Sequence, residues 1–387
     1  MKKFALAAFA VLVGIGGLLA LAAPHPPEPP EAFGNLAAMD AYFEALTSAG
    51  DPPGLSLAVV RDGQIVLARS YGTADATTGT PVTNETVFHW WSMTKLATAA
   101  AVLRLTDEGR LGLDDPVVSH LPFFSVEGPD GSQSVTIRHL LDHSSGLGDA
   151  MPDMMGWIHY DDAPKNQTDL LRAHLPRFAK LQFAPGTGHT YTNFGYMALG
   201  AVIEAVTGES YENHIARSVL APLAMKDSAF IYPAGIGSLA AAGSHPLVHF
   251  FTPFLPFLLD VGDLVKERIG TRLWFNPLYI DATPPTGLIG TAEDAARLLW
   301  ALSEKGGFLS SQSIALMRNE KGRMPLAWAD FADGDRPWLQ HRGGGPGFAA
   351  IMRLYPEEGL GFVLLANGTN LDGESLVVRL AEMEWAT

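Results

Sequence analysis

Ser92 and Lys95 lie three positions apart at the start of an Ala- and Leu-rich run. This run predicts a helix from Ser92 to Glu108, ended by Gly109. Residues three apart share one face of a helix, so the serine hydroxyl and the lysine amine can approach each other. A helix start also offers backbone N–H groups and partial positive charge, which stabilise a developing alkoxide. The spacing is therefore typical of a serine nucleophile with a lysine base, provided that burial keeps the lysine partly neutral.

The same tetrapeptide, SMTK, also has an ordinary structural interpretation. Serine is a favoured residue at helix starts and lysine is common on surfaces, so most Ser-x-x-Lys sequences do no chemistry. Here the motif occurs once in the chain, and it follows Trp90 and Trp91, which form a poor environment for a solvated lysine. These two facts favour the catalytic interpretation.

Two later segments carry the partners that such a serine needs. Tyr191-Thr192-Asn193 precedes a predicted helix, and His341-Arg342-Gly343 lies at the end of a predicted strand. In this order and at these spacings, SMTK, YTN and HRG resemble the three motifs of the serine β-lactamase and penicillin-binding-protein superfamily. The Tyr-x-Asn form resembles the branch of class C β-lactamases, D-alanyl-D-alanine carboxypeptidases, D-aminopeptidases and family VIII carboxylesterases. The resemblance covers the chain from about residue 35 to its C-terminus.

The resemblance implies a role for each motif residue. Ser92 would attack a carbonyl and form an acyl-enzyme, with Lys95 and Tyr191 sharing the general-base work. Asn193 would hydrogen-bond both Lys95 and the acyl side of the substrate. The backbone N–H groups of Ser92 and Gly344 would form the oxyanion hole.

The third motif differs from that of most β-lactamases. His341 replaces the usual lysine, as in carboxypeptidase, aminopeptidase and some esterase members, and we expect it to be catalytic. Arg342 stands where a small or hydroxyl residue is usual, and would bind a substrate carboxylate or narrow the cleft. Gly343 would let the backbone approach the substrate closely. We expect Trp91 to contact the substrate as well.

Other residues invite different chemistry. His139 and His143 have the i, i+4 spacing of metal ligands, but no HExxH pattern accompanies them, and we expect no metal site. Asp142 and His143 with Ser144 or Ser145 suggest a Ser-His-Asp triad, but sequence neighbours seldom meet in that geometry and no G-x-S-x-G elbow is present. We expect a structural loop beside the cleft.

Composition excludes several classes of protein. The 387 residues contain no cysteine, which removes thiol nucleophiles, thiolate metal sites and disulfides. A formal net charge of −15 argues against nucleic-acid binding, since phosphates require a basic face. We expect no cofactor, and a small ester, amide or lactam as the substrate.

Strands at both chain ends enclose a mostly helical middle. Two β-rich runs within residues 54–72 flank Asp62-Gly63, a strong hairpin signal. Predicted helices span residues 136–143, 168–175, 193–208, 291–307 and 373–384. Thr291 and Asp294 form a possible cap pair at the start of the fourth of these helices. Predicted strands in the last part of the chain span residues 324–330, 337–341, 347–356 and 359–367. This order predicts an α+β fold of the β-lactamase/transpeptidase-like kind, in which both ends form one antiparallel sheet flanked by helices, with an inserted helical domain.

The N-terminus has the pattern of an export signal. Lys2 and Lys3 precede an apolar run over residues 4–23. That run is close to the roughly 20 residues that span a bilayer, so a retained anchor is the alternative to cleavage near residues 20–22. The proline-rich residues 24–32 would form a stiff tether. We expect a periplasmic or extracellular protein, with tethering to the inner membrane as the alternative.

The expected domain organisation follows from these patterns. Its parts are a signal peptide or membrane anchor at residues 1–23, a tether at 24–32, and a hydrolase domain at 33–387, with an α/β part at about 33–110 and 291–387 and a helical insertion at about 111–290.

Residues 246–262 form an unusually apolar segment that Pro253 and Pro256 interrupt. It is too short and too broken to span a membrane. Core or subunit packing, a wall over the acyl pocket and a membrane-touching patch remain as alternatives.

Our leading hypothesis is an exported serine hydrolase that cleaves carboxylic esters or small amides through a Ser92 acyl-enzyme. A β-lactamase, a D-alanyl-D-alanine carboxypeptidase or a D-aminopeptidase would use the same chemistry, and fold analogy cannot choose among them. An acylated sensor or a non-catalytic binding module is the alternative of another class. The oligomeric state is not predicted.

Overall fold

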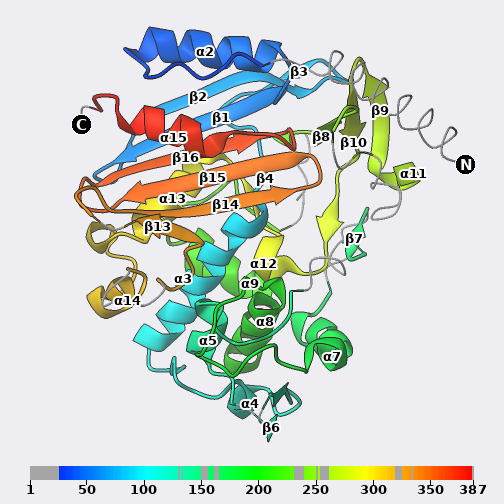
Figure 1. Cartoon of the computed structure of the whole chain (residues 1–387), viewed down its shortest axis with the longest axis vertical. Coiled ribbons are helices and arrows are strands. Elements are labelled where there is room, and N and C mark those ends of the chain that lie inside the picture. The colour runs from blue at the N-terminus through cyan, green and yellow to red at the C-terminus, as the bar shows by residue number, and fades with distance from the viewer. Residues whose placement is uncertain are drawn as a thin grey trace, which may run out of the picture.

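The two ends of the chain meet in one antiparallel sheet (Figure 1). This computed structural model describes residues 26–129, 131–132, 134–149, 156–160, 165–230, 239–249, 252, 261–318, 325–332 and 334–385. The sheet has seven strands in the order β13-β14-β15-β16-β1-β2-β3. Its strands are β1 (Gly54–Arg61), β2 (Gln64–Asp75), β3 (Thr80–Pro81), β13 (Asp330–Ala332), β14 (Trp338–Gly345), β15 (Phe348–Tyr355) and β16 (Leu360–Ala366). The predicted sheet from both chain ends is confirmed.

The predicted hairpin is the N-terminal half of this sheet. Strands β1 and β2 pair antiparallel from Gly54↔Gly72 to Arg61↔Gln64. The two turn residues both have positive φ, 44° at Asp62 and 84° at Gly63. Asp-Gly tolerates this conformation, which matches the right-handed twist of the flanking strands. β1 also pairs with β16, so the hairpin joins the C-terminal strands directly.

Helices cover both faces of the sheet. The helices that pack on the sheet or position the site are α2 (Leu36–Ser48), α3 (Thr94–Asp107), α8 (Asn193–Thr207), α12 (Thr283–Thr286), α13 (Ala292–Ala301) and α15 (Gly373–Ala381). α2 and α15 share one apolar cluster with the sheet, and α3, α8 and α13 belong to a second, larger one. The other α-helices of the described residues are α4 (Val117–His120), α5 (Ile137–Leu141), α7 (Gln167–Phe178), α9 (Tyr211–Ile215), α11 (Val261–Leu264) and α14 (Ser311–Leu316).

Short strands form small sheets that are separate from the seven-stranded one. They are β4 (Phe88–His89) with β12 (Ile289–Gly290), β5 (Glu127–Gly128) with β6 (Gly131–Ser132), β7 (Ile158–His159) with β11 (Tyr279–Ile280), and β8 (Ser244–Pro246) with β10 (Arg272–Phe275) and β9 (Val265–Ile269). The β4–β12 pair matters for the site, because β4 leads directly into the turn before α3.

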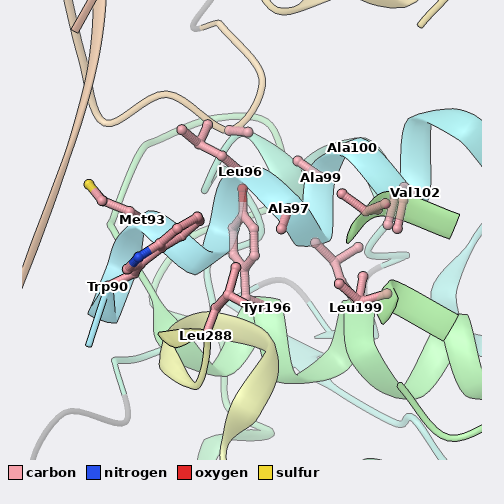
Figure 2. Close-up of a cluster of buried hydrophobic side chains, with 14 of the residues drawn as sticks. Trp90, Met93, Leu96, Ala97, Ala99, Ala100, Val102, Tyr196, Leu199 and Leu288 are labelled. Atoms are coloured by element: carbon pink, nitrogen blue, oxygen red, sulfur yellow. The ribbon is translucent and has the colours of Figure 1, made fainter. Parts of the chain in front are cut away.

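The central helix α3 is buried along most of its length against α8. Figure 2 shows Tyr196 of α8 and Leu288 of the segment after α12 on one side of α3, with Trp90 at its start. All three side chains are almost fully buried. Small alanine side chains on α3 allow the close approach of α8, and burial of this apolar surface stabilises the arrangement. The start of α3 is therefore held rigidly from several sides.

Most predicted elements are confirmed, with two exceptions. Residues 324–330 were expected to form a strand, but of the described residues 325–330 only Asp330 lies in one, as the first residue of β13. Leu326 and Trp328 bury in the core from an irregular segment, so their apolar character reflects packing rather than a strand. Helix α13 ends at Ala301, earlier than the predicted 291–307.

The predicted cap at the start of α13 is half correct. The Thr291 hydroxyl accepts from the backbone N–H of Asp294 at 3.2 Å. The carboxylate of Asp294 does not return the bond; it accepts from Ser228 Oγ and from the N–H of Asp227, both at 2.9 Å. This side chain thus ties α13 to the inserted region instead of capping the helix.

Some predictions concern residues outside the described part. The predicted signal or anchor at 1–23 and most of the apolar segment 246–262 lie there. Within the described residues, no helix has the length and apolar character to cross a membrane. Part of the predicted tether is described: Tyr42 Oη donates to Pro27 O at 3.4 Å, and Arg379 donates to the carbonyl of Pro30.

Candidate active site

The nucleophile candidate sits in a tight turn between β4 and α3. Trp91 has a φ of 47°, uncommon for a residue with a side chain, and begins the 3₁₀ turn Trp91–Met93 that carries Ser92. From the first turn of α3, Lys95 donates from Nζ to Ser92 Oγ at 3.3 Å. The predicted approach of serine and lysine is therefore present.

Lys95 is fully buried and has three hydrogen-bond acceptors. Besides Ser92 Oγ, its Nζ donates to Asn193 Oδ1 at 2.7 Å and to Pro285 O at 3.1 Å. Burial lowers the pKa of this amine well below its usual value, and the negative charge of Asp149 partly opposes that shift. A lysine with a lowered pKa can hold a neutral, proton-accepting form near neutral pH, as a general base requires.

Tyr191 approaches the same serine from the loop before α8. Its hydroxyl is hydrogen-bonded to Ser92, and its ring centroid lies 4.8 Å from Lys95 Nζ. Burial raises the pKa of the phenol, and the hydrogen bond with Ser92 works against that rise. The phenol is therefore protonated at neutral pH and is placed to exchange a proton with Ser92 and the buried lysine.

The ring of His143 packs against the ring of Tyr191. Its ring centroid lies 4.5 Å from that of Tyr191, and its Nδ1 accepts the backbone N–H of Thr192 at 3.2 Å. The residue has a φ of 59° and is buried. Burial, reinforced by Lys95, lowers the histidine pKa well below its usual value, so the ring is neutral. His143 thus belongs to a structural loop beside the site.

Asn193 joins Lys95 to a carboxylate that sequence reasoning missed. Asp149 Oδ1 accepts from Asn193 Nδ2 at 3.2 Å and from the backbone N–H of Asn193 at 3.3 Å. The two residues are 44 positions apart and no sequence motif contains Asp149. Its one signal in the sequence is its place six residues after His143.

His341 lies on β14 with its ring turned into the molecule. Its Nδ1 is 2.8 Å from the carbonyl oxygen of Arg342, which can only accept, so Nδ1 carries the proton. Its Nε2 is buried, has no hydrogen-bond partner among the residues that the structure describes, and is consequently an acceptor. Burial and the neighbouring Lys95 lower the pKa of His341 to about 3, so the ring is neutral at working pH.

Arg342 has protein partners instead of an open position in the site. Its guanidinium lies 3.1 Å from Asp330 Oδ2 and 2.8 Å from Glu374 Oε1. On the sheet it stands opposite Ile351, which packs beneath Gly373 of α15. Opposed residues of neighbouring strands share a face, so Arg342 points to the α15 side. The guanidinium therefore pairs with two carboxylates of the same chain, and the predicted contact with a substrate carboxylate stays a prediction.

The three glycines after Arg342 bring β14 against the nucleophile turn. A Cβ on Gly343 would lie 2.0 Å from Trp90 O and 3.4 Å from Ser92 N. One on Gly345 would lie 2.3 Å from the Trp91 ring. A Cβ on Gly344 would have no atom within 4 Å, so this residue of the strand does not pack against the nucleophile turn. The backbone N–H groups of Ser92 and Gly344 remain our candidates for the oxyanion hole.

Trp91 does not line an open pocket. Its side chain is 2% exposed, stacks on His89 with ring centroids 5.6 Å apart, and rests on Gly345. The expected substrate contact through this ring is therefore corrected to a packing role, which fixes the distance between β14 and the turn that carries Ser92.

The alternative sites have other arrangements. Asp142 Oδ1 accepts from the N–H and Oγ of Ser144, and His143 Nδ1 is occupied by Thr192, so no Ser-His-Asp chain forms among them. His139 Nδ1 accepts from the N–H of Thr136 as part of a capping box. Within the described residues, no group of three or more His, Asp or Glu side chains is placed to hold a metal ion.

The chain matches known proteins over most of its length. Residues 39–382 match the family model described as Beta-lactamase. Esterase EstB from Burkholderia gladioli is 33% identical over 306 residues, which cover 74% of this chain and 75% of that protein. Penicillin-binding protein 4 from Amycolatopsis lactamdurans is 28% identical, over 84% of each protein.

Solved structures share the architecture. The D-amino acid amidase from Ochrobactrum anthropi SV3, in complex with L-phenylalanine, matches 88% of this chain and 96% of its own. The TM-score is 0.70 and the identity 23%, which supports the fold alone.

Proposed function

Since the chain belongs to the β-lactamase family and is a serine hydrolase of that fold, we propose that it is an esterase. We further propose that it is exported and that it acts through an acyl-enzyme on Ser92. Its substrates would be carboxylic esters without a free carboxylate, with small amides as poorer ones. The observation that carries the proposal is the convergence on Ser92 of Lys95 at 3.3 Å and of the hydrogen-bonded Tyr191 hydroxyl.

Acylation would proceed by a proton relay through these two side chains. Ser92 Oγ attacks the ester carbonyl while its proton moves to neutral Lys95, directly or through the Tyr191 phenol. The tetrahedral oxyanion is stabilised by the backbone N–H groups of Ser92 and Gly344. Collapse of this intermediate expels the alcohol, which takes up the transferred proton.

Deacylation would reverse the relay. Water attacks the Ser92 ester, and Lys95 with Tyr191 accepts its proton and returns one to Ser92 Oγ. The acid product leaves and the starting protonation states are restored. The neutral Nε2 of His341 adds an acceptor at this side of the site.

The charge of the third motif favours esters over β-lactams and D-alanyl peptides. Those two classes carry a carboxylate, which binds best to a free cation. His341 is neutral because its pKa is lowered to about 3, and Arg342 is paired with Asp330 and Glu374. Neither side chain of this motif offers an unpaired positive charge. The similarity to an esterase supports the same choice.

A β-lactamase or D-alanyl peptidase remains the second candidate, supported by the similarity to a penicillin-binding protein. An acylated sensor is the third, and it differs from an enzyme in the lifetime of the acyl group. All three share the acylation of Ser92, so turnover rather than labelling separates them.

The test is a matched pair of esters. Soluble protein starting near residue 31 would be assayed with p-nitrophenyl butyrate and with p-nitrophenyl hemiglutarate, which adds a terminal carboxylate to a similar acyl chain. We expect kcat/KM at least tenfold higher for butyrate, a difference of about 1.4 kcal/mol. Preference for hemiglutarate, or for a chromogenic cephalosporin, would contradict the proposed substrate class. Equal rates for Ser92→Ala and wild type would contradict the mechanism itself.

Export rests on the charged and apolar pattern of residues 1–23. Expression of the full chain in a bacterium, followed by fractionation and N-terminal sequencing, should locate the protein outside the cytoplasm. Recovery of uncleaved protein in the membrane fraction would favour the anchor over the cleaved signal. Recovery in the cytoplasm would contradict export.

A further inference from the structure

We propose that Asp149 is a positioning residue of this active site, which orients the amide of Asn193 so that Lys95 faces its oxygen and not its NH₂ group. The proposal rests on the proposed Ser92 mechanism and adds to it a residue outside the three motifs. Asp149 acts through Asn193 and does not touch Ser92 or Lys95 in any hydrogen bond of the described residues.

Asp149, Asn193 and Lys95 are linked by hydrogen bonds whose donors and acceptors have a fixed order. An amide side chain has one accepting end and one donating end, and rotation by 180° exchanges them. A carboxylate can only accept, so Asp149 Oδ1 at 3.2 Å requires the NH₂ end of Asn193. The opposite end, Oδ1, then meets Lys95 Nζ at 2.7 Å. With the amide reversed, Asn193 Oδ1 would face the Asp149 carboxylate, so that two acceptors would meet in a buried place, and the bond that Lys95 Nζ donates would be lost.

A second hydrogen bond fixes the backbone of the same residue. The N–H of Asn193, in the first turn of α8, donates to the same Oδ1 of Asp149 at 3.3 Å. Asp149 therefore anchors both the helix start and the side chain that emerges from it. Because Asn193 is fully buried, loss of this anchor would leave unpaired donors, which is costly.

The charge of Asp149 also acts on the base. Burial lowers the pKa of Lys95, and Asp149 is the charged group that raises it. The other groups facing Lys95 are Ser92, Asn193, the carbonyl of Pro285, the rings of Tyr191 and Tyr196 at 4.8 and 5.5 Å, and the neutral His143 and His341. Among these groups, Asp149 is the one carboxylate that stabilises the protonated lysine, and it is connected to Lys95 through Asn193.

Two substitutions separate the orienting role from the charge. Asp149→Asn keeps an acceptor of the same size and removes the charge. Asp149→Ala removes both. The matched control is Asp114→Asn, which removes one negative charge from a side chain that is 79% exposed and paired with Arg138. Thermal unfolding of each variant checks that it is folded.

The pH profile of kcat/KM tests the charge. If neutral Lys95 is the base, kcat/KM rises with pH as the lysine loses its proton. Without the Asp149 charge the protonated lysine is less stable, so the rising limb of Asp149→Asn moves to lower pH. Asp114→Asn should keep the wild-type limb. If the rising limb of kcat/KM does not move in Asp149→Asn, or moves equally in Asp114→Asn, the Asp149 charge does not act on Lys95.

A double-substitution cycle tests the orientation. We expect Asp149→Ala to lower kcat and the rate of Ser92 labelling by a fluorophosphonate together, by roughly tenfold or more, with KM little changed. In an Asn193→Ala background the same substitution should have little further effect, because its target is gone. Additive losses, or a loss confined to KM, would overturn the positioning role. If Asp149→Ala does not fold, Asp149→Leu, which also removes the acceptor and is close to aspartate in size, takes its place in the cycle.

The outcome is distinguishable from failure of the proposed function. If wild type and Ser92→Ala label equally, the Ser92 mechanism fails whatever Asp149 does. If wild type labels at Ser92 and the Asp149 variants match it at every pH, the mechanism stands and the role of Asp149 is wrong.

Discussion

Lys95 Nζ lies closer to Asn193 Oδ1, at 2.7 Å, than to Ser92 Oγ, at 3.3 Å. The amide oxygen holds the amine in place but cannot take its proton. The amine therefore remains available to exchange a proton with the serine. Full burial of Lys95 makes this arrangement useful, since desolvation lowers its pKa toward the range of a general base.

Replacing the lysine tests its role as a base. Arginine keeps the positive charge and cannot lose its proton, so Lys95→Arg should lower kcat/KM by roughly 10²–10⁴-fold and abolish the rising limb of the pH profile. Lys95→Ala should be equally inactive, which separates loss of the base from the larger size of arginine. The measurement is steady-state hydrolysis of p-nitrophenyl butyrate from pH 5 to 10. A Lys95→Arg variant with a wild-type profile would show that another group accepts the proton.

Removing one phenol oxygen tests the relay. Tyr191→Phe should lower kcat by about 10²–10⁴-fold with a small change in KM, because the hydroxyl bonded to Ser92 is lost and the ring remains. The matched control is Tyr196→Phe, whose hydroxyl donates to Leu141 O at 3.1 Å. That variant should lose about 1 kcal/mol of stability and little activity. Equal kinetic effects of both substitutions would argue against a specific relay through Tyr191.

Neighbouring glycines of β14 should respond in opposite ways to the same substitution. In Gly343→Ala the new methyl would collide with Trp90 O, so we expect a loss of about 1–3 kcal/mol in stability and of most activity. Gly344→Ala meets open space and keeps its backbone N–H, so it should fold normally and retain activity on small esters. Urea unfolding and ester hydrolysis provide both readouts. A tolerated Gly343→Ala would mean that β14 is not packed against Trp90.

Buried neutral histidines make the fold sensitive to acid. Burial lowers the pKa of His341 to about 3 and that of His89 to about 4, while both take up protons near pH 6.5 once unfolded. The unfolded chain therefore binds more protons below pH 6.5, and the free energy of unfolding falls as pH drops toward 4. We expect a loss of about 2 kcal/mol per buried histidine between pH 7.5 and 5. Urea unfolding at both pH values measures it, and His341→Asn should reduce the difference.

A free energy of unfolding that stays constant from pH 7.5 to 5 would contradict the neutral state of these rings. It would also remove one reason why His341 offers no positive charge to a substrate carboxylate.

Much of this architecture could be predicted from local patterns. Asp62-Gly63 between two β-rich runs predicted the first hairpin, and Thr291 marked the start of α13 correctly. The order SMTK, YTN, HRG predicted which distant segments converge on Ser92, because each motif carries a partner that this chemistry needs. The strand predicted at residues 324–330 was wrong, because an irregular segment with buried apolar residues can have the same composition as a strand.

The remaining errors come from direction and from distance along the chain. Arg342 follows His341 directly on a strand, so the two side chains point to opposite faces, and the motif does not show that Arg342 pairs with Asp330 and Glu374. Trp91 carries a positive φ that turns it into the core, which composition does not reveal. Asp149 meets Asn193 through tertiary folding alone.

Mass spectrometry after reaction with a fluorophosphonate identifies the serine that attacks. We expect one adduct, mapped to the peptide that contains Ser92, formed faster as pH rises through the lysine titration and absent in Ser92→Ala. An adduct on a different serine, or labelling of Ser92→Ala at the wild-type rate, would contradict the assignment of Ser92 as the nucleophile.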